Sequence, residues 1–186
     1  MVIIIEKDRV SFAAPISSIE RDEAILFTDA IKPDNLPFWK INGCKNAIMA
    51  GWARTRGNDA VRYQKGLFES EINVKNLAHK TMPKLQKIME NEDLIENERG
   101  RWLNFYYVAQ GNKAYKVYHD CAIEIEDFEA IGPYFEIAIS SLERTKELDR
   151  DERLRILSRE CQALGYGALL PMAVMDTKTR KIKILK

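Results

Sequence analysis

The fold is decided by the stretch Phe128-Glu-Ala-Ile-Gly-Pro-Tyr-Phe135, which stands where one kind of sequence pattern gives way to another. Two runs typical of strands come before it, at Ala114–Tyr118 and Ala122–Ile125. The apolar residues that begin at Phe135 and continue to Leu142 recur at helical spacing. The stretch therefore marks the passage from a strand-rich region to a helical one.

The amino-terminal residues are also rich in strand patterns. β-Branched runs on either side of a short polar turn predict a hairpin over residues 2–14, and Ala24–Thr28 is a further strand candidate. A second hairpin is predicted over residues 38–52, because the pair Asn42-Gly43 tolerates the positive φ angles of a tight turn.

Helices are predicted in two blocks. The first block covers Asn58–Glu69 and a second helix that begins at the N-cap Asn73, which Pro83 should kink or restart because proline lacks an N–H. In the second block, the helix from Phe135 is followed by one with a capping box at Asp149. The predicted buried stripe of this last helix is Leu154, Leu157, Cys161 and Leu164.

The remaining segments complete a regular order of elements. A strand is predicted over Leu103–Ala109, and a closing hairpin pairs Pro171–Met175 with Lys181–Leu185. The order is thus strands, two helices, strands, two helices, strands. This order fits either two stacked antiparallel sheets between helix layers or a less regular α+β domain.

Composition limits the class of protein. The 186 residues predict a single domain, 1–186, and with 46% hydrophobic and 31% charged residues the chain has the composition of a soluble globular protein. Because 29 basic residues are balanced by 28 acidic ones, charge gives no reason to expect a nucleic-acid or membrane partner. Three cysteines without CxxC spacing, all in apolar contexts, predict buried reduced thiols, and the lack of a signal-peptide pattern predicts a cytoplasmic protein.

Five segments resemble, in order along the chain, those of proteasome-type β subunits, the family that includes the bacterial peptidase HslV. The resemblance implies an α+β fold, a four-layer αββα sandwich with two stacked antiparallel sheets between helix layers. Three segments resemble strands of the family: Val10–Ala14 its second strand, Lys40–Gly51 its strand–turn–strand ending in Ala-Gly, and Pro171–Asp176 its penultimate strand. Asn58–Ala60 is similar to the start of the family's first long helix. Phe128–Tyr134 is similar to the family's Ala-Ile-Gly-Ser-Gly segment without the middle small residues.

The sequence lacks the residues that the family's chemistry requires. The family cleaves peptide bonds with an N-terminal threonine, whose α-amine takes the proton of the attacking hydroxyl. This chain begins Met1-Val2, and neither side chain can attack a carbonyl. The family's Asp after the second strand is replaced by Pro15, its Lys by Pro37, and its Asp-x-x-Ser pair has no counterpart over residues 163–170. The prediction is a protein without threonine catalysis, without catalytic residues, and without a cofactor or metal.

The candidate binding site is the run Arg54-Thr55-Arg56. The resemblance places it after the strand whose backbone N–H groups line the family's cleft, where two guanidiniums would bind a carboxylate or phosphate. The alternative is a solvated start of a helix. His119 with Cys121 is a weaker candidate, for a nucleophile pair on one strand face.

The predicted function is that of a proteasome-like or HslV-like scaffold that assembles with itself or binds a protein partner, and the resemblance implies a homo-oligomeric ring. The alternative is a hydrolase or peptidase of the N-terminal nucleophile superfamily with a relocated or differently processed nucleophile. A third hypothesis is an anion-binding module that uses Arg54 and Arg56. Exposed apolar side chains on the predicted helices within residues 58–90 and 133–164 would favour assembly.

Overall fold

The computed structural model describes residues 1–16, 36–52, 55–96, 101–102 and 105–186, and within these ranges the strands form two five-stranded antiparallel sheets. The first sheet consists, in spatial order, of β10 (Phe128–Ala130), β1 (Val2–Glu6), β2 (Arg9–Pro15), β11 (Met172–Asp176) and β12 (Ile182–Leu185). The second consists of β3 (Phe38–Lys40), β4 (Ala47–Trp52), β7 (Phe105–Gln110), β8 (Lys113–Val117) and β9 (Ala122–Ile125). A short ribbon pairs β5 (Ile95–Glu96) with β6 (Arg101–Trp102).

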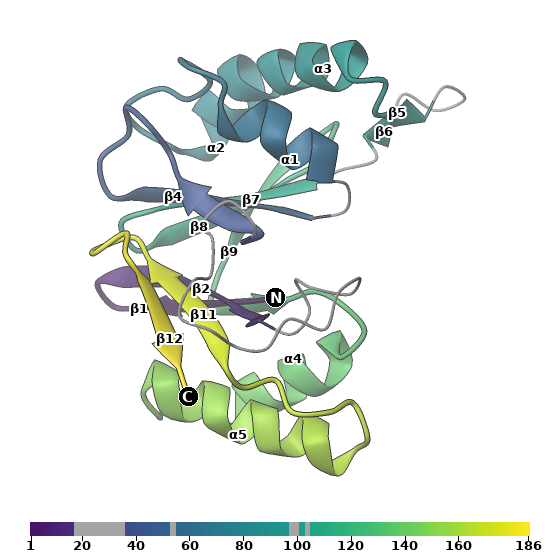
Figure 1. Cartoon of the computed structure of the whole chain (residues 1–186). Coiled ribbons are helices and arrows are strands. Elements are labelled where there is room, and N and C mark those ends of the chain that lie inside the picture. Colours follow the sequence, from purple (N-terminus) through teal and green to yellow (C-terminus); the bar gives the residue numbers. More distant parts are fainter. Residues whose placement is uncertain (17–35, 53–54, 97–100, 103–104) are drawn as a thin grey trace.

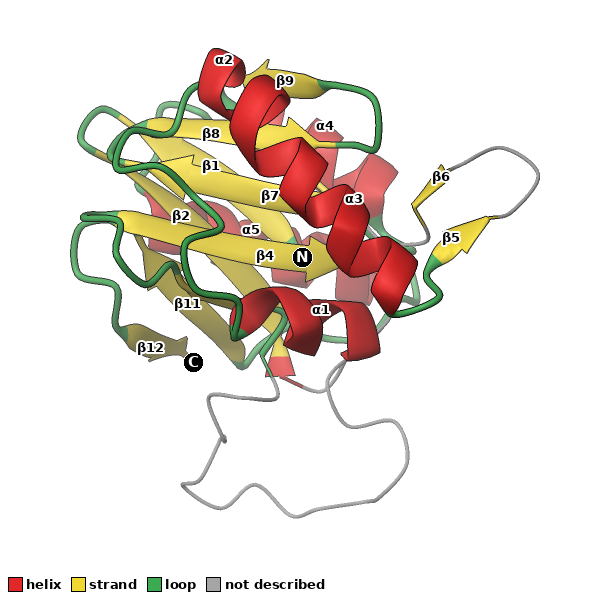
Figure 2. Cartoon of the chain, turned by 90° about the horizontal axis from the view of Figure 1, so that it is seen from above, coloured by secondary structure: helices red, strands yellow, loops and turns green. Residues whose placement is uncertain are grey.

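Helices cover the outer face of each sheet, so that the molecule has four layers (Figure 1). The second sheet is covered by α1 (Thr55–Arg62), α2 (Val74–Asn76), the π-helical turn Leu77–Thr81 and α3 (Met82–Asn91), and Figure 2 shows α3 lying across its strands. The first sheet is covered by α4 (Phe135–Arg144) and α5 (Arg150–Ala163). The predicted αββα sandwich of two antiparallel sheets between helix layers is confirmed.

Successive side chains of a strand point to opposite faces of its sheet, and in both sheets the side chains on each face are mainly apolar. In β1, the side chain of Ile3 packs between the sheets with that of Met1, while Val2 and Ile4 pack against α4 and α5. The second sheet divides its residues in the same way: Ile48 faces the first sheet, whereas Met49 packs against the helices above. Each fully buried Ile or Phe stabilises the fold by about 1.5–3 kcal/mol. Because alternate residues of a strand are apolar on both faces, each sheet is most stable when both of its faces are covered.

The helix caps predicted at Asn73 and Asp149 are confirmed. The Oδ1 atom of Asn73 accepts a hydrogen bond from the backbone N–H of Asn76 at 2.8 Å, and that of Asp149 accepts from Asp151 and Glu152 at 3.0 and 3.1 Å. Pro83 restarts a helix as predicted: the π-helical turn directly precedes α3, in which Pro83 stands near the first position.

Two helix predictions are wrong in extent. The helix predicted over 58–69 begins earlier, at Thr55, and ends at Arg62. Gly66, with φ of +66°, lies in the connection that follows. Leu67 is nevertheless buried, so its apolar character reflects packing under α3 rather than a longer helix. Leu164, predicted on a buried stripe, is 63% exposed because α5 ends one residue earlier and Gly165 takes a φ of +84°.

The histidine–cysteine prediction is also wrong. The backbone N–H of Tyr118 donates to the oxygen of Cys121 at 2.8 Å, so His119 and Cys121 lie in the connection between β8 and β9 rather than on one strand face. All three cysteines are free, but Cys121 is half-buried, whereas Cys44 and Cys161 are buried as predicted. The strand predicted at 24–28 lies outside the described residues.

Candidate functional site

The candidate site lies at the head of β1, where the two ends of a long stretch of chain meet. The α-amine of Met1 donates to the backbone oxygen of Ile131 at 2.9 Å, and the N–H of Ile131 donates back to the oxygen of Met1 at 2.9 Å. These bonds extend the pairing of β1 with β10, in which Val2 faces Ala130. The stretch that decides the fold therefore forms one wall of the site.

A glycine makes the sharp turn in this wall. Gly132 has a φ of +114°, which side chains other than glycine's rarely tolerate. Its backbone oxygen accepts from the N–H of Phe135 at 3.1 Å, which directs the chain into α4. Tyr134, at the start of this helix, is buried with its hydroxyl 3.2 Å from the Met1 nitrogen.

Burial determines the charge of the groups in the site. It lowers the pKa of the Met1 α-amine from 8.0 to about 5, so the amine is neutral at pH 7. Burial also raises the pKa of the Tyr134 hydroxyl, which keeps its proton. A neutral amine can accept a proton, but the thioether of Met1 has no proton to give, and its side chain is only 3% exposed.

Pro15 and Pro37 stand where the resemblance expects an Asp and a Lys. Pro15 lies at the end of β2, opposite Met172 of β11. Pro37 accepts a hydrogen bond from the N–H of Gly51 through its backbone oxygen at 3.0 Å. Around them, an apolar cluster contains Met1, Ala14, Ile16, Leu36 and Phe38. None of these side chains carries a charge that could position or activate a nucleophile.

The predicted binding run lies at the start of α1. Arg54 is outside the described residues, and the structure describes the backbone of Thr55 and Arg56 but not their side chains. Close to them, the side-chain amide of Asn58 donates to the backbone oxygen of Gly51 at 3.4 Å. Two of the segments that carry the family resemblance therefore contact each other here.

Other reactive groups do not form a site among the described residues. The pKa of the Cys121 thiol is raised by desolvation and by its neighbour Asp120, which disfavours the thiolate. The described part of the chain brings together no group of three or more potential metal-ligating side chains. Nor does any helix within it have the length and apolarity to cross a membrane.

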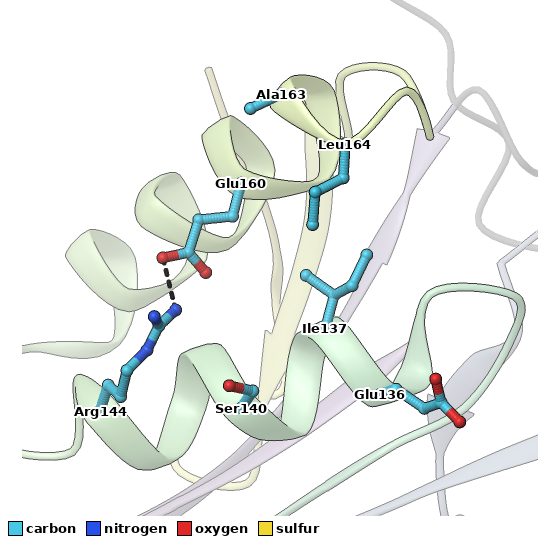
Figure 3. Close-up of a pocket in the computed structure, with 7 residues that line it drawn as sticks. All are labelled: Glu136, Ile137, Ser140, Arg144, Glu160, Ala163 and Leu164. Carbon is cyan, nitrogen blue, oxygen red and sulfur yellow. Dashed lines mark hydrogen bonds and ion pairs between the residues drawn. The ribbon is translucent and has the colours of Figure 1, made fainter.

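A groove of about 450 Å³ runs between α4 and α5 on the outer face of the helix layer. Figure 3 shows Ile137 and Leu164 pointing toward each other across it, and Arg144 joined to Glu160. The Arg144 Nη2 to Glu160 Oε1 distance is 2.7 Å. Sequence patterns do not reveal this groove, because the helical stripe places Leu164 in the core.

No family model matches the sequence, and no curated protein matches it significantly. Solved structures do match. The chain superposes on BPH from Thiobacillus denitrificans, alone and in complex with epoxomicin, with a TM-score of 0.67 and 13% identity over 100% of this chain and 98% of that chain. It also superposes on Anbu (ancestral beta-subunit) from Yersinia bercovieri with a TM-score of 0.57 and 11% identity over 100% of this chain and 86% of that chain.

The fold is that of a proteasome-type β subunit. At these identities the comparison establishes the fold and not the activity.

Proposed function

We propose that this chain is a proteasome-like scaffold that assembles with itself and does not perform threonine proteolysis. The observation that carries the proposal is the buried side chain of Met1 at the head of β1, the position where the family resemblance expects the nucleophile. An N-terminal nucleophile needs a hydroxyl or thiol beside its own amine, and the thioether of Met1 is neither.

The positions that would support a nucleophile favour the same proposal. Activation of a threonine hydroxyl requires charged or hydrogen-bonding groups that hold the amine and hydroxyl in place. Pro15 and Pro37 offer only backbone oxygens, and the Met1 amine is held by an oxygen of the backbone and by the Tyr134 hydroxyl.

The second candidate is a hydrolase with a relocated or differently processed nucleophile, and one observation favours it. The Met1 amine is a neutral base at pH 7, as such a mechanism requires. The hydroxyl of Ser11 is a poor choice of relocated nucleophile, because Ser11 is only 1% exposed and pairs with Ile4 rather than with the head of β1. The scaffold therefore remains the better-supported proposal.

Self-assembly is proposed through the outer face of α4 and α5. Leu164 is 63% exposed and lines the groove between the two helices with Ile137. Phe135, the first residue of α4, and Tyr166, which follows α5, are 49% and 53% exposed. Isolated apolar side chains are common on surfaces, but a cluster beside a groove is typical of an interface.

The occupant of this face is proposed to be a second copy of the chain, because the charges of the groove complement themselves. Glu136 and Arg144 both line the groove on α4, and the small Ser140 lies midway between them. If two α4 helices pack antiparallel about a two-fold axis at Ser140, Glu136 of each copy faces Arg144 of the other. In this arrangement, Ile137 and Leu164 of each copy would pack against the other copy beside the ion pairs.

Sedimentation velocity at micromolar concentration tests this proposal. We expect a discrete oligomer for the wild-type chain, and at least tenfold weaker association for Leu164→Glu, which places a charge in the apolar contact. Glu136→Arg should also weaken association, because it would face Arg144 of the second copy. A monomeric wild-type chain would contradict the assembly.

Two variants control for nonspecific effects. Tyr63→Glu introduces a charge at a side chain that is 67% exposed but follows α1 on the opposite helix layer, and Glu147→Arg makes the same charge change as Glu136→Arg outside the groove. Both controls should leave association unchanged. If they weaken association as much as Leu164→Glu and Glu136→Arg, the α4–α5 face is not the interface.

The run Arg54-Thr55-Arg56 is kept as a proposal for a carboxylate- or phosphate-binding element of the same scaffold. Its support is the position of Thr55 and Arg56 at the start of α1, near the end of β4.

A further inference from the structure

A second pocket opens at the edge of the sandwich, where the two sheets end side by side. It has a volume of about 360 Å³ and lies between β3, the edge strand of the second sheet, and β12, the edge strand of the first. The described residues that line it are Phe38, Trp39, Lys40, Arg62, Met175, Arg180, Lys181 and Ile182.

The floor of the pocket is apolar and well packed. Phe38 and Met175 belong to the core between the sheets, and Trp39 is 8% exposed in the core beneath the helices. Because these side chains are held by their own packing, they offer a fixed apolar surface to a bound molecule.

The rim of the pocket is cationic. Four of the described lining residues are basic, and none of the described lining residues is acidic. The chain as a whole has a net charge of only +1, so the positive charge of the pocket rim is locally concentrated. Lys40, Arg180 and Lys181 form no ion pair with any residue that the structure describes, so no described carboxylate neutralises them.

Two of these cations are held in position by the protein. The guanidinium of Arg62 lies 4.9 Å from the centroid of the Trp39 ring and donates to the backbone oxygen of Leu36 at 2.7 Å. Arg180 donates to the backbone oxygen of Cys44 at 3.2 Å. The contact of Arg180 leaves other N–H groups of its guanidinium for an anion, since a guanidinium carries five.

We propose that this pocket binds a small organic oxyanion, a molecule with one apolar ring or short alkyl chain and a carboxylate or phosphate head. The apolar part would lie on Phe38, Trp39 and Met175, and the head would meet the cationic rim. Carboxylate and phosphate are the groups that a planar guanidinium recognises best. The volume lies at the lower end of the range of small-molecule pockets, which fits a ligand of this size.

This inference depends neither on self-assembly nor on the absence of proteolysis. The pocket lies at the edge formed by β3 and β12, whereas the α4–α5 groove lies on the outer helix layer. Failure of one proposal therefore leaves the other unaffected.

Isothermal titration calorimetry with matched probes tests the proposal. The probes are 4-phenylbutanoate, phenyl phosphate and the uncharged 4-phenylbutanamide. We expect one molecule of an anionic probe to bind per chain, at least tenfold more tightly than the amide. The tighter of the two anions identifies the head group. No binding of either anion, or equal affinity for the amide, would overturn the proposal.

Variants locate the binding to this pocket. The double variant Arg180→Gln/Lys181→Gln should weaken binding of the preferred anion at least tenfold, and Lys40→Gln alone, on the opposite wall, should weaken it severalfold. The control Lys75→Gln/Lys87→Gln makes the same charge change as the double variant at exposed positions of α2 and α3. If the control weakens binding as much, or if neither pocket variant does, the anion binds elsewhere and the proposal fails. Lys40→Gln keeps the test decisive if the double variant does not fold.

Discussion

Asp151 links the start of α5 to the edge strand β12. Its Oδ1 accepts from Arg150 Nε at 2.8 Å and its Oδ2 accepts from Lys183 Nζ at 2.6 Å. Desolvation raises the pKa of this carboxyl, but the hydrogen bonds from Lys183 and Arg150 lower it more, so that the pKa lies below its usual value. The carboxylate of Asp151 therefore joins α5 to β12 through an ion pair.

This coupling predicts a pH dependence. A carboxyl with a lower pKa in the folded than in the unfolded state adds stability that is complete above its unfolded pKa and is lost as the pH falls through the folded pKa. Asp151→Asn should therefore lower the free energy of unfolding by about 0.5–1 kcal/mol at pH 7, the upper range for a solvent-accessible ion pair. The difference from wild type should vanish at pH values below the folded pKa.

Urea denaturation at several pH values measures this difference. Asp59→Asn, at an exposed position of α1, controls for the loss of a carboxylate as such. A difference between Asp151→Asn and wild type that stays constant down to low pH would show that charge is not its cause.

At the scale of elements, β4 and α1 approach each other at a glycine. A Cβ atom added at Gly51 would overlap the side-chain amide of Asn58 and come within 3.1 Å of the Tyr106 ring. The Asn58 amide donates to the oxygen of the same glycine. The absence of a side chain at Gly51 is therefore what lets the helix lie so close to the strand.

Gly51→Ala should cost about 1–3 kcal/mol of stability, the range for overpacking a tight contact. Asn58→Ala should cost less in the Gly51→Ala background than in wild type, because Asn58 must already have given up its position there. Thermal or urea unfolding of the two single variants and the double variant measures this coupling. Additive costs would mean that the two residues do not meet as described.

Local features of these elements could be predicted from sequence. The caps at Asn73 and Asp149 and the restart at Pro83 are determined by residues within one or two turns, so that neighbouring side chains specify them. The closing hairpin is likewise set by two short apolar runs around a polar turn. The order of these elements, with the family resemblance, was enough to predict the four layers.

Features that depend on distant packing could not be predicted in this way. Leu67 and Leu164 both looked like parts of helical stripes, yet one is buried beyond the end of α1 and the other is exposed beyond the end of α5. The contact of Met1 with Ile131 joins residues far apart in the chain, and no local pattern encodes it. The pocket between β3 and β12 also arises only when the sheets stack.

At the scale of the whole molecule, the pairing of β1 with β10 in the first sheet brings together the head of β1 and the turn before α4. The resemblance expects the nucleophile at this head and the Ile131-Gly132 segment beside it. The structure places the buried Met1 at the head and the positive-φ turn at Gly132 next to it. The proposed scaffold function rests on this arrangement.

The central claim is that no nucleophile stands at the head of β1. Native mass spectrometry of the protein made from its own gene tests it most directly, because it gives the mass of each mature chain and of the assembly together. The account predicts a chain that begins at Met1 or Val2 within a discrete oligomer. A mature chain that begins with threonine, serine or cysteine would contradict the account and make the protein a candidate peptidase.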